Sequence, residues 1–249
     1  MFNFIFKKKK IIVECFTDNP NALEYFPIKP ASAFLPDWWR NLPKTYEVEE
    51  SNGLRFRRPT MKSCDGFTNL YKRGFMIPLW SDLVVETSST NFKWTFADGQ
   101  SHLSFHDVDQ MSTEFMSYAQ FKISSPWRIR ESTGVKFVFM QPTYNYTKEF
   151  FDLHIIPGVV DFKYQHATNI NVFAQKGRRF EMVAGKPLAH LIPLIDEDIE
   201  IECKSIQVDN FNEVKLLNNN YPWFIGSYKK TKKIVDDQET CPFHRGKNK

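Results

Sequence analysis

Ten short apolar segments, each bounded by turn-forming residues, lie between Phe75 and Ile195, within about 120 residues. Each is five to nine residues long, the usual length of one β-strand. None alternates with a helical pattern, as a parallel α/β sheet would require. The spacing therefore predicts a mainly β, antiparallel fold of the β-clip, jelly-roll or sandwich kind. The segments read FMIPLW, DLVVE, NFKWTF, YAQFKI, PWRIRE, VKFVFM, LHIIP, NINVFAQ, RRFEMV and PLAHLIPLI.

Helical periodicity is confined to a few places outside this run. Apolar residues recur at three- and four-residue spacing before Gly74, which predicts one short helix near 62–73. In the segment PDWWRN, Pro36 is placed to start a single helical turn whose tryptophans form an aromatic cap over the core. The stretch 210–230 predicts a helix interrupted by Pro222, and the residues after it are expected to be loop.

The length of 249 residues and the 42% of hydrophobic residues allow one sizeable core and exclude a disordered or collagen-like chain. We expect a basic N-terminal tail over 1–10, a single β-rich domain over 11–208 that includes the helix, and a helical annex with a basic tail over 209–249. A short strand, IIVECF, opens the domain. No run of 18 apolar residues is present, so a membrane partner is not expected.

The formal charge of +4 is concentrated at the two ends of the chain, beginning with four lysines at 7–10. Terminal basic runs are typical of solvated tails, so specific nucleic-acid binding is not expected. The same lysines follow the first apolar residues, the reverse of an export signal. The four cysteines are far apart and contain no CxxC pair, so the sequence indicates neither a zinc ribbon nor a disulfide framework. A cytoplasmic location, or one in a virion, is expected.

The segment 157–194 has the most informative local pattern. Its glycine, two apolar residues, aspartate and tyrosine resemble a motif of the deoxyuridine triphosphatase and deoxycytidine triphosphate deaminase group. The resemblance implies that Asp161 orients or deprotonates a water molecule and that Tyr164 packs against a base or sugar. The ligand would also contact Gly158, His166 and Gln141. The serine-rich phosphate-binding segment of that group is absent. The alternative is structural: Asp161 caps its own turn and Tyr164 anchors a strand pair.

From about residue 10 to 245 the chain also resembles an uncharacterised family of phage and bacterial proteins. The segments that carry this likeness are PASAFLPDWWRNLP, TMKSCDGF, GFMIPLWSDL and SPWRIRESTG. The resemblance implies a phage or bacterial context but no activity.

A divalent metal is the one cofactor that the sequence suggests. His102 and His106 lie four residues apart, with Asp107, Asp109 and Gln110 nearby, and two histidines with a carboxylate can hold non-haem iron or manganese. On a helix the two rings would lie together, whereas on a strand they would be about 13 Å apart. The alternative is a polar loop with one histidine at the edge of the core.

Three functions follow from these patterns. The first is a phage-type accessory protein whose β scaffold holds a small-molecule pocket for a nucleotide or a similar anionic metabolite. The second is a non-catalytic virion or assembly protein, in which aromatic surfaces meet other subunits as a homo-oligomer or phage assembly. The third is a cupin-like metal oxygenase.

Overall fold

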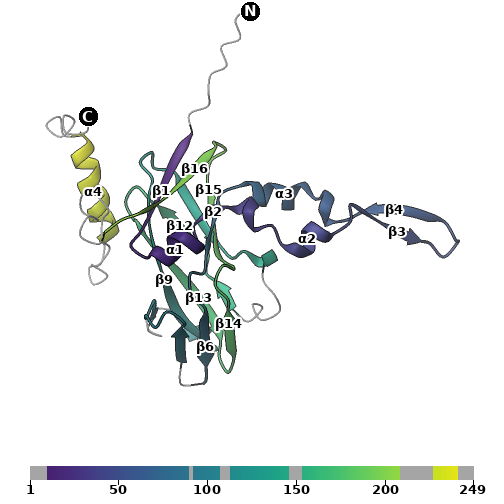
Figure 1. The fold of residues 1–249 in the computed structure, drawn as a ribbon, viewed down its shortest axis with the longest axis horizontal. Helices are drawn as coiled ribbons and strands as arrows, with labels where there is room; N and C mark the ends of the chain where they lie inside the picture. Colours follow the sequence, from purple (N-terminus) through teal and green to yellow (C-terminus); the bar gives the residue numbers. More distant parts are fainter. Residues whose placement is uncertain (1–9, 90–91, 107–112, 146–152, 208–226, 241–249) are drawn as a thin grey trace, which may run out of the picture.

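The computed structural model describes residues 10–89, 92–106, 113–145, 153–207 and 227–240 of the chain. Its body is mainly β and sandwich-like, with sheets that are almost entirely antiparallel, which confirms the predicted fold class. An arm projects from one side of this body, and a helix lies along the opposite side (Figure 1). No helix of the described residues is long and apolar enough to cross a membrane.

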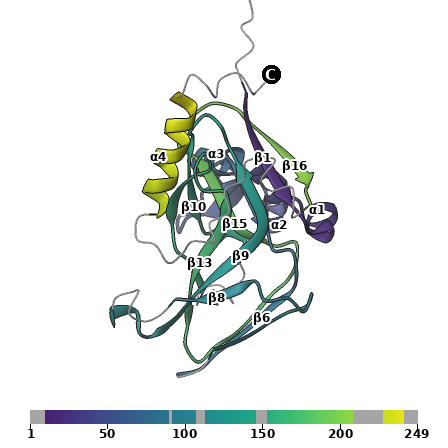
Figure 2. The ribbon, with the colours of Figure 1, turned by 90° about the vertical axis from the view of Figure 1, so that its left-hand side faces the viewer.

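The first sheet is the largest, and its long strands β9 and β13 run through the body in Figure 2. Only β1 and β16 pair in parallel in it, in a register that places Cys15 opposite Cys203. In sheet order the strands are β11 (Leu153–Ile155), β13 (Ala167–Gln175), β9 (Tyr118–Arg130), β1 (Ile11–Thr17) and β16 (Ile199–Ser205), and β8 (Leu103–Phe105) also pairs with β9.

Two further sheets complete the body. All of their strands pair antiparallel. The five-stranded sheet has the order β12 (Gly158–Asp161), β10 (Lys136–Met140), β15 (Pro187–Pro193), β5 (Phe75–Pro78) and β2 (Lys29–Pro30). The three-stranded sheet has the order β14 (Arg179–Met182), β6 (Leu83–Thr87) and β7 (Phe92–Phe96).

One hydrophobic cluster fills the space between these sheets. Its fully buried members come from all three sheets, for example Trp127 of β9, Phe137 of β10 and Leu83 of β6. Alternate residues of each strand point inward, because successive side chains of a strand lie on opposite faces. The short, alternating segments of the sequence therefore form the walls of a single core.

Strand β9 differs from the prediction because it joins two expected strands, YAQFKI and PWRIRE, into one of 13 residues. Pro126 lies at the join, where the pairing of β9 with β13 shifts register between Ala167 and Asn169. Proline has no N–H to donate, and an irregularity of this kind is where a sheet tolerates it. The proline thus interrupts the ladder without ending the strand.

The helices are few. Helix α1 (Pro20–Tyr25) follows β1, and Asn19 caps it by accepting from the Ala22 N–H at 3.1 Å. Helix α3 (Asp65–Lys72) confirms the helix predicted near 62–73. The interrupted helix predicted for 210–230 lies mostly outside the described residues. Helix α4 (Ser227–Thr240), which has no internal glycine or proline, confirms a helical annex near the C-terminus. It continues to residue 240, so the expectation of loop directly after 230 is wrong.

The arm is formed by the chain between β2 and β5 (Figure 1). Near the body it contains α3 and three short helical segments, and at its far end it carries a two-stranded sheet that pairs with no other strand of the described residues. Its remaining elements are η1 (Ala31–Phe34), α2 (Asp37–Asn41), β3 (Thr45–Glu49), β4 (Arg55–Pro59) and η2 (Met61–Ser63). The single helical turn expected after Pro36 is therefore present as α2.

Candidate functional site

Asp161 ends strand β12 and closes the turn after it. Its backbone carbonyl accepts from the N–H groups of Tyr164 (3.2 Å) and Gln165 (3.0 Å), and its Oδ1 accepts from the Lys163 N–H at 3.1 Å. The residue is buried, and burial raises the pKa of the carboxyl group. These bonds are those of the structural alternative, an aspartate that caps its own turn.

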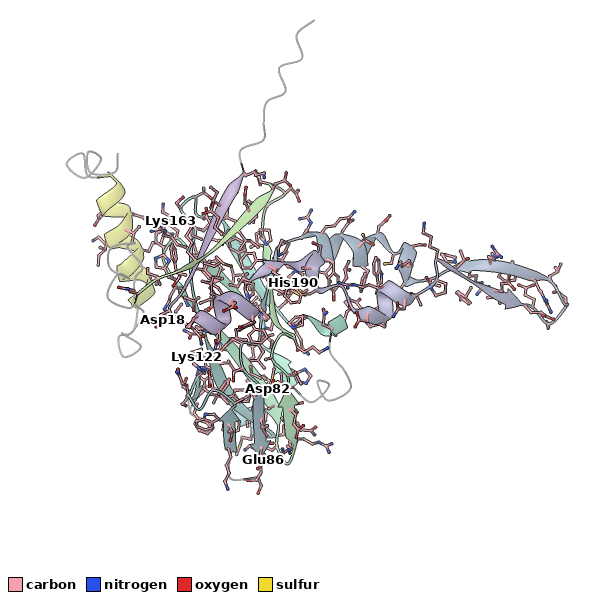
Figure 3. The ribbon with its side chains drawn as sticks, in the orientation of Figure 1. Asp18, Asp82, Glu86, Lys122, Lys163 and His190 are labelled. Atoms are coloured by element: carbon pink, nitrogen blue, oxygen red, sulfur yellow. The ribbon has the colours of Figure 1, made fainter. Side chains whose placement is uncertain are left out.

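Tyr164 lies on the same turn and is buried against helix α4. Its hydroxyl donates to Asp236 Oδ1 at 2.7 Å, which raises the pKa of the phenol. The ammonium groups of Lys163 and Lys232 lie 5.5 Å and 5.4 Å from the centre of its ring. Lys163 is on the side of the body that faces α4 (Figure 3). The ring that the resemblance assigns to a base or sugar thus contacts a helix of the same chain.

The other expected ligand contacts also have partners within the fold. His166 is buried, its Nδ1 is 2.8 Å from the Ile129 carbonyl, and burial lowers the pKa of its ring. The Gln141 amide donates to the Leu153 carbonyl at 3.2 Å and accepts from the Ile155 N–H at 3.0 Å, which ties β11 to the end of β10. Gly158 lies on β12, opposite Phe139. Asp161 and Tyr164 share one turn, His166 follows it directly before β13, and the chemical roles of all three stay predictions.

The two histidines proposed as metal ligands stand at opposite ends of β8, and their rings have different partners. His102 Nε2 is 2.9 Å from Asp98 Oδ2, and its ring packs edge-on against Trp80. His106 Nε2 is 3.0 Å from Asn171 Oδ1. The strand separates the rings in the way expected of residues i and i+4 on a strand. Within the described ranges, no group of three His, Cys, Asp or Glu side chains is placed to hold a metal ion.

A small hollow opens beside β8 and β9. Its volume is about 170 Å³, and the rings of Phe92, Phe105 and Tyr118 form its apolar wall. Its polar lining includes Gln120 and Lys176, together with two serines, Ser88 and Ser89. The Oε1 atom of Gln120 is buried and has no hydrogen-bond partner among the residues that the structure describes. The lining includes His106 but not Asp161 or Tyr164.

The base of the arm is an aromatic cluster centred on Phe67 of α3. Trp39 stacks on the Phe67 ring at 5.4 Å, Tyr71 stacks at 4.9 Å, and Tyr144 meets its edge at 4.8 Å. Since Tyr144 belongs to the body, the cluster joins arm and body. The predicted aromatic cap therefore covers this separate cluster instead of the main core.

Lys62 fixes the end of α2 within the arm. Its ammonium lies 4.1 Å from the centre of the Trp39 ring and donates to the carbonyls of Trp39 (3.0 Å) and Arg40 (2.9 Å). A lysine that binds the last carbonyls of a helix satisfies groups that have no partner within the helix. The hairpin beyond is thus attached to a firmly packed base.

The hairpin of β3 and β4 has two unlike faces. Directly paired residues of antiparallel strands lie on the same face. One face, here called the charged face, carries Glu47, Glu49, Arg55 and Arg57, and its cross-strand ion pairs measure 3.5 Å (Arg57 to Glu47) and 2.8 Å (Arg55 to Glu49). The other, here called the apolar face, carries Tyr46, Val48, Leu54 and Phe56.

Part of the apolar face is open to solvent. Tyr46 is 48% exposed and Leu54 is 64% exposed, while Val48 and Phe56 are half-buried against each other. Arg58 lies over the Phe56 ring, 4.9 Å from its centre. An unsupported two-stranded ribbon is marginally stable in water, and an exposed apolar patch commonly marks a contact surface.

The hairpin is absent from the sequence-based predictions, although its signal is present. Asn52 and Gly53 stand between two short alternating runs, YEVE and LRFRR, and an Asn-Gly pair in that setting is a strong hairpin signal. In the structure Gly53 has φ +81°, and the Leu54 N–H donates to Asn52 Oδ1 at 3.0 Å.

Comparison with known proteins does not add to this picture. No protein-family model and no curated protein matches the chain. A function for the chain is therefore inferred from the geometry of the described residues.

Proposed function

We propose that this chain is a non-catalytic assembly component that contacts another protein molecule through the apolar face of its β3–β4 hairpin. The observation that carries the proposal is the exposure of Tyr46 and Leu54 on a ribbon that no other part of the described structure covers. Burying these side chains would remove apolar surface from water and stabilise the ribbon at the same time.

The position of the hairpin supports the same role. It lies at the far end of the arm, well away from the body (Figure 1), where a partner can reach it without touching the sheets. The Phe67 cluster holds the arm to the body, so little conformational entropy is lost when the hairpin docks. The resemblance to phage and bacterial proteins agrees with such a role, because virions are built from repeated protein contacts.

A photo-crosslinking amino acid at position 56 tests this function in cells that express the gene from its own context. We expect adducts from the Phe56 position, identified by mass spectrometry, and none from the same amino acid placed at Val159, which is 62% exposed on the body. Equal labelling at both positions, or none at position 56, would contradict the proposal.

A second function, binding of a small anionic metabolite, is favoured by one observation, the unpartnered Gln120 Oε1 in a hollow that also contains Lys176. The resemblance of 157–194 to nucleotide enzymes suggests nucleoside phosphates as the first ligands to try. A ligand at about 100 times its dissociation constant should add about 2.7 kcal/mol of stability. Thermal unfolding of the native protein, of Gln120→Leu and of Asp161→Asn would show whether the ligand binds in the hollow or at the Asp161 turn. The variant that loses the ligand-induced shift identifies the place. A panel without any shift would exclude this function.

A further inference from the structure

We infer that the partner of the apolar face is a second copy of this chain, docked face to face and antiparallel about a two-fold axis. The inference rests on the proposed function, since it names the protein that the hairpin contacts. A two-fold contact uses the same patch on both molecules, so the patch must complement itself. The hairpin meets this requirement in both its apolar and its charged residues.

The charges on the apolar face stand at its two ends. Arg58 lies at the base of the hairpin, opposite Tyr46, and Glu50 lies at the tip, where its N–H donates to the Leu54 carbonyl. Among the described residues neither side chain has an ion-pair partner, in contrast to the glutamates and arginines of the charged face. Val48 and Phe56 lie between these two unlike charges, while Tyr46 stands beside Arg58 and Leu54 beside Glu50.

The order of these charges selects one docking direction. When the tip of one hairpin lies over the base of the other, each Glu50 stands at the same end of the contact as the Arg58 of the second copy, diagonally across the two strands. The apolar residues then meet in the centre of the contact. In the parallel arrangement the two Glu50 side chains would share one end of the contact and the two Arg58 side chains the other, which is repulsive. Parallel docking would also bring the two bodies to the same end, whereas antiparallel docking places them at opposite ends of the joined arms.

Charge composition separates this partner from a polyanion. The hairpin 45–59 carries three glutamates and three arginines and is therefore neutral. A nucleic-acid surface presents an excess of lysine and arginine. The glutamates also disfavour an anionic lipid surface. A neutral face with a glutamate at one end and an arginine at the other complements a second copy of itself better than it complements a nucleic acid or an anionic lipid surface.

The size of the contact predicts its strength. Two strands of five residues form a ribbon roughly 17 Å long, so a face-to-face contact would bury about 600 to 800 Å² in total. Contacts of that size are weak and reversible. We therefore expect a dimer with a dissociation constant in the micromolar range, about 1 to 100 µM.

Sedimentation equilibrium of the full chain, up to about 200 µM, tests the inference. The native protein should approach twice 29.4 kDa, and Phe56→Asp should remain a monomer with unchanged thermal unfolding. Glu50→Arg and Arg58→Glu should each weaken the dimer about tenfold, because the pair occurs twice in a two-fold contact, and the double variant should regain native affinity. Glu47→Gln and Arg57→Gln alter only the charged face and are the matched controls.

Three results would overturn the second-copy inference. They are a monomer at every concentration, a dimer that is indifferent to Phe56→Asp, and a double variant no tighter than the single ones. Flotation with phosphatidylcholine and phosphatidylglycerol vesicles, lost in Phe56→Asp, would identify a lipid surface in place of a second copy. The crosslink at position 56 separates the two proposals. An adduct with a different protein overturns only the second-copy inference, and the absence of any adduct overturns both.

Discussion

Gly74 connects α3 of the arm to β5 of the body, and only glycine fits there. Its φ is +68°, and a Cβ atom at this position would lie 1.9 Å from the Leu191 carbonyl oxygen. Gly74→Ala should therefore reduce the free energy of unfolding by about 2 to 4 kcal/mol. Gly99→Ala is the control, since Gly99 has φ +73° but open space around it, and should cost only about 1 kcal/mol. Urea unfolding of the two variants measures the difference, and equal losses would contradict the clash.

Glu131 is a buried carboxylate that holds the turn after β9. It accepts from the backbone N–H groups of Thr133 (2.6 Å), Gly134 (2.7 Å) and Val135 (2.9 Å). In Glu131→Gln an amide NH₂ would face one or more of these donors, so we expect a loss of about 2 to 3 kcal/mol in the free energy of unfolding. Glu86→Gln, at a more exposed carboxylate, should change stability by less than about 0.5 kcal/mol. A similarly small change for Glu131→Gln in urea unfolding would contradict the role of this carboxylate in holding the turn after β9.

Two buried histidines make stability depend on pH. Burial lowers the pKa of His166 and of His190 below the ordinary value of 6.5 in the folded protein. The unfolded chain therefore binds more protons below pH 6.5, and the free energy of unfolding should fall as the pH drops from 6.5 toward the folded pKa values. The raised pKa of the Asp161 carboxyl has the opposite sign, because this group binds its proton more tightly in the folded protein and favours folding as the pH falls.

Urea unfolding between pH 7.5 and 5.0 tests this dependence. The double variant His166→Gln, His190→Gln should show a free energy of unfolding that changes less with pH in this range. Its stability at pH 7.5 should be lower than that of the native protein. His154→Gln changes an exposed histidine and should leave the slope as it is. A native slope that survives in the double variant would assign the pH dependence to other groups.

At the scale of elements, the Tyr164 hydroxyl anchors helix α4 on the body. An isolated helix of 14 residues is marginal in water, so α4 depends on such contacts. Asp236→Asn keeps the shape of the side chain but removes the charge that accepts from the Tyr164 hydroxyl at 2.7 Å. Amide hydrogen exchange over 227–240 should become about five- to tenfold faster, while exchange in β9 stays unchanged. Lys233→Ala, at an exposed position of the same helix, should change amide exchange little. If exchange became as fast in Lys233→Ala as in Asp236→Asn, the Tyr164 hydroxyl would have no special role in anchoring α4.

The sequence predicts elements well where the pattern is local. Alternating strands and the helix before Gly74 could be predicted directly, because side-chain burial follows their periods. The length of β9 could not, since Pro126 suggests a break and only the register shift against β13 accommodates it. The site depends still more on distant contacts. The bond from Tyr164 to Asp236 joins residues 72 positions apart, and the Gln141 amide reaches β11. The Asn52-Gly53 signal could have revealed the hairpin, but not that its apolar face is left uncovered.

At the scale of the whole molecule, the arm acts as a spacer. The Phe67 cluster packs tightly between α2, α3 and Tyr144, so the hairpin is held at a fixed distance from the core. Because the hairpin contributes nothing to the main hydrophobic cluster, variants of its apolar face should leave the body intact. This separation allows assembly to be tested without loss of folding.

Antiparallel docking of two hairpins predicts the shape of the dimer. Two joined arms would hold the bodies at opposite ends, so small-angle X-ray scattering at dimer-forming concentrations should give a pair-distance distribution with two maxima. Phe56→Asp should give one maximum with an extended shoulder from its single arm. Glu50→Arg should shift the distribution toward that of the monomer, and its combination with Arg58→Glu should restore the native distribution, because the exchanged charges again form unlike pairs. A compact dimer with one maximum would mean that the bodies touch and that the hairpins do not form the contact.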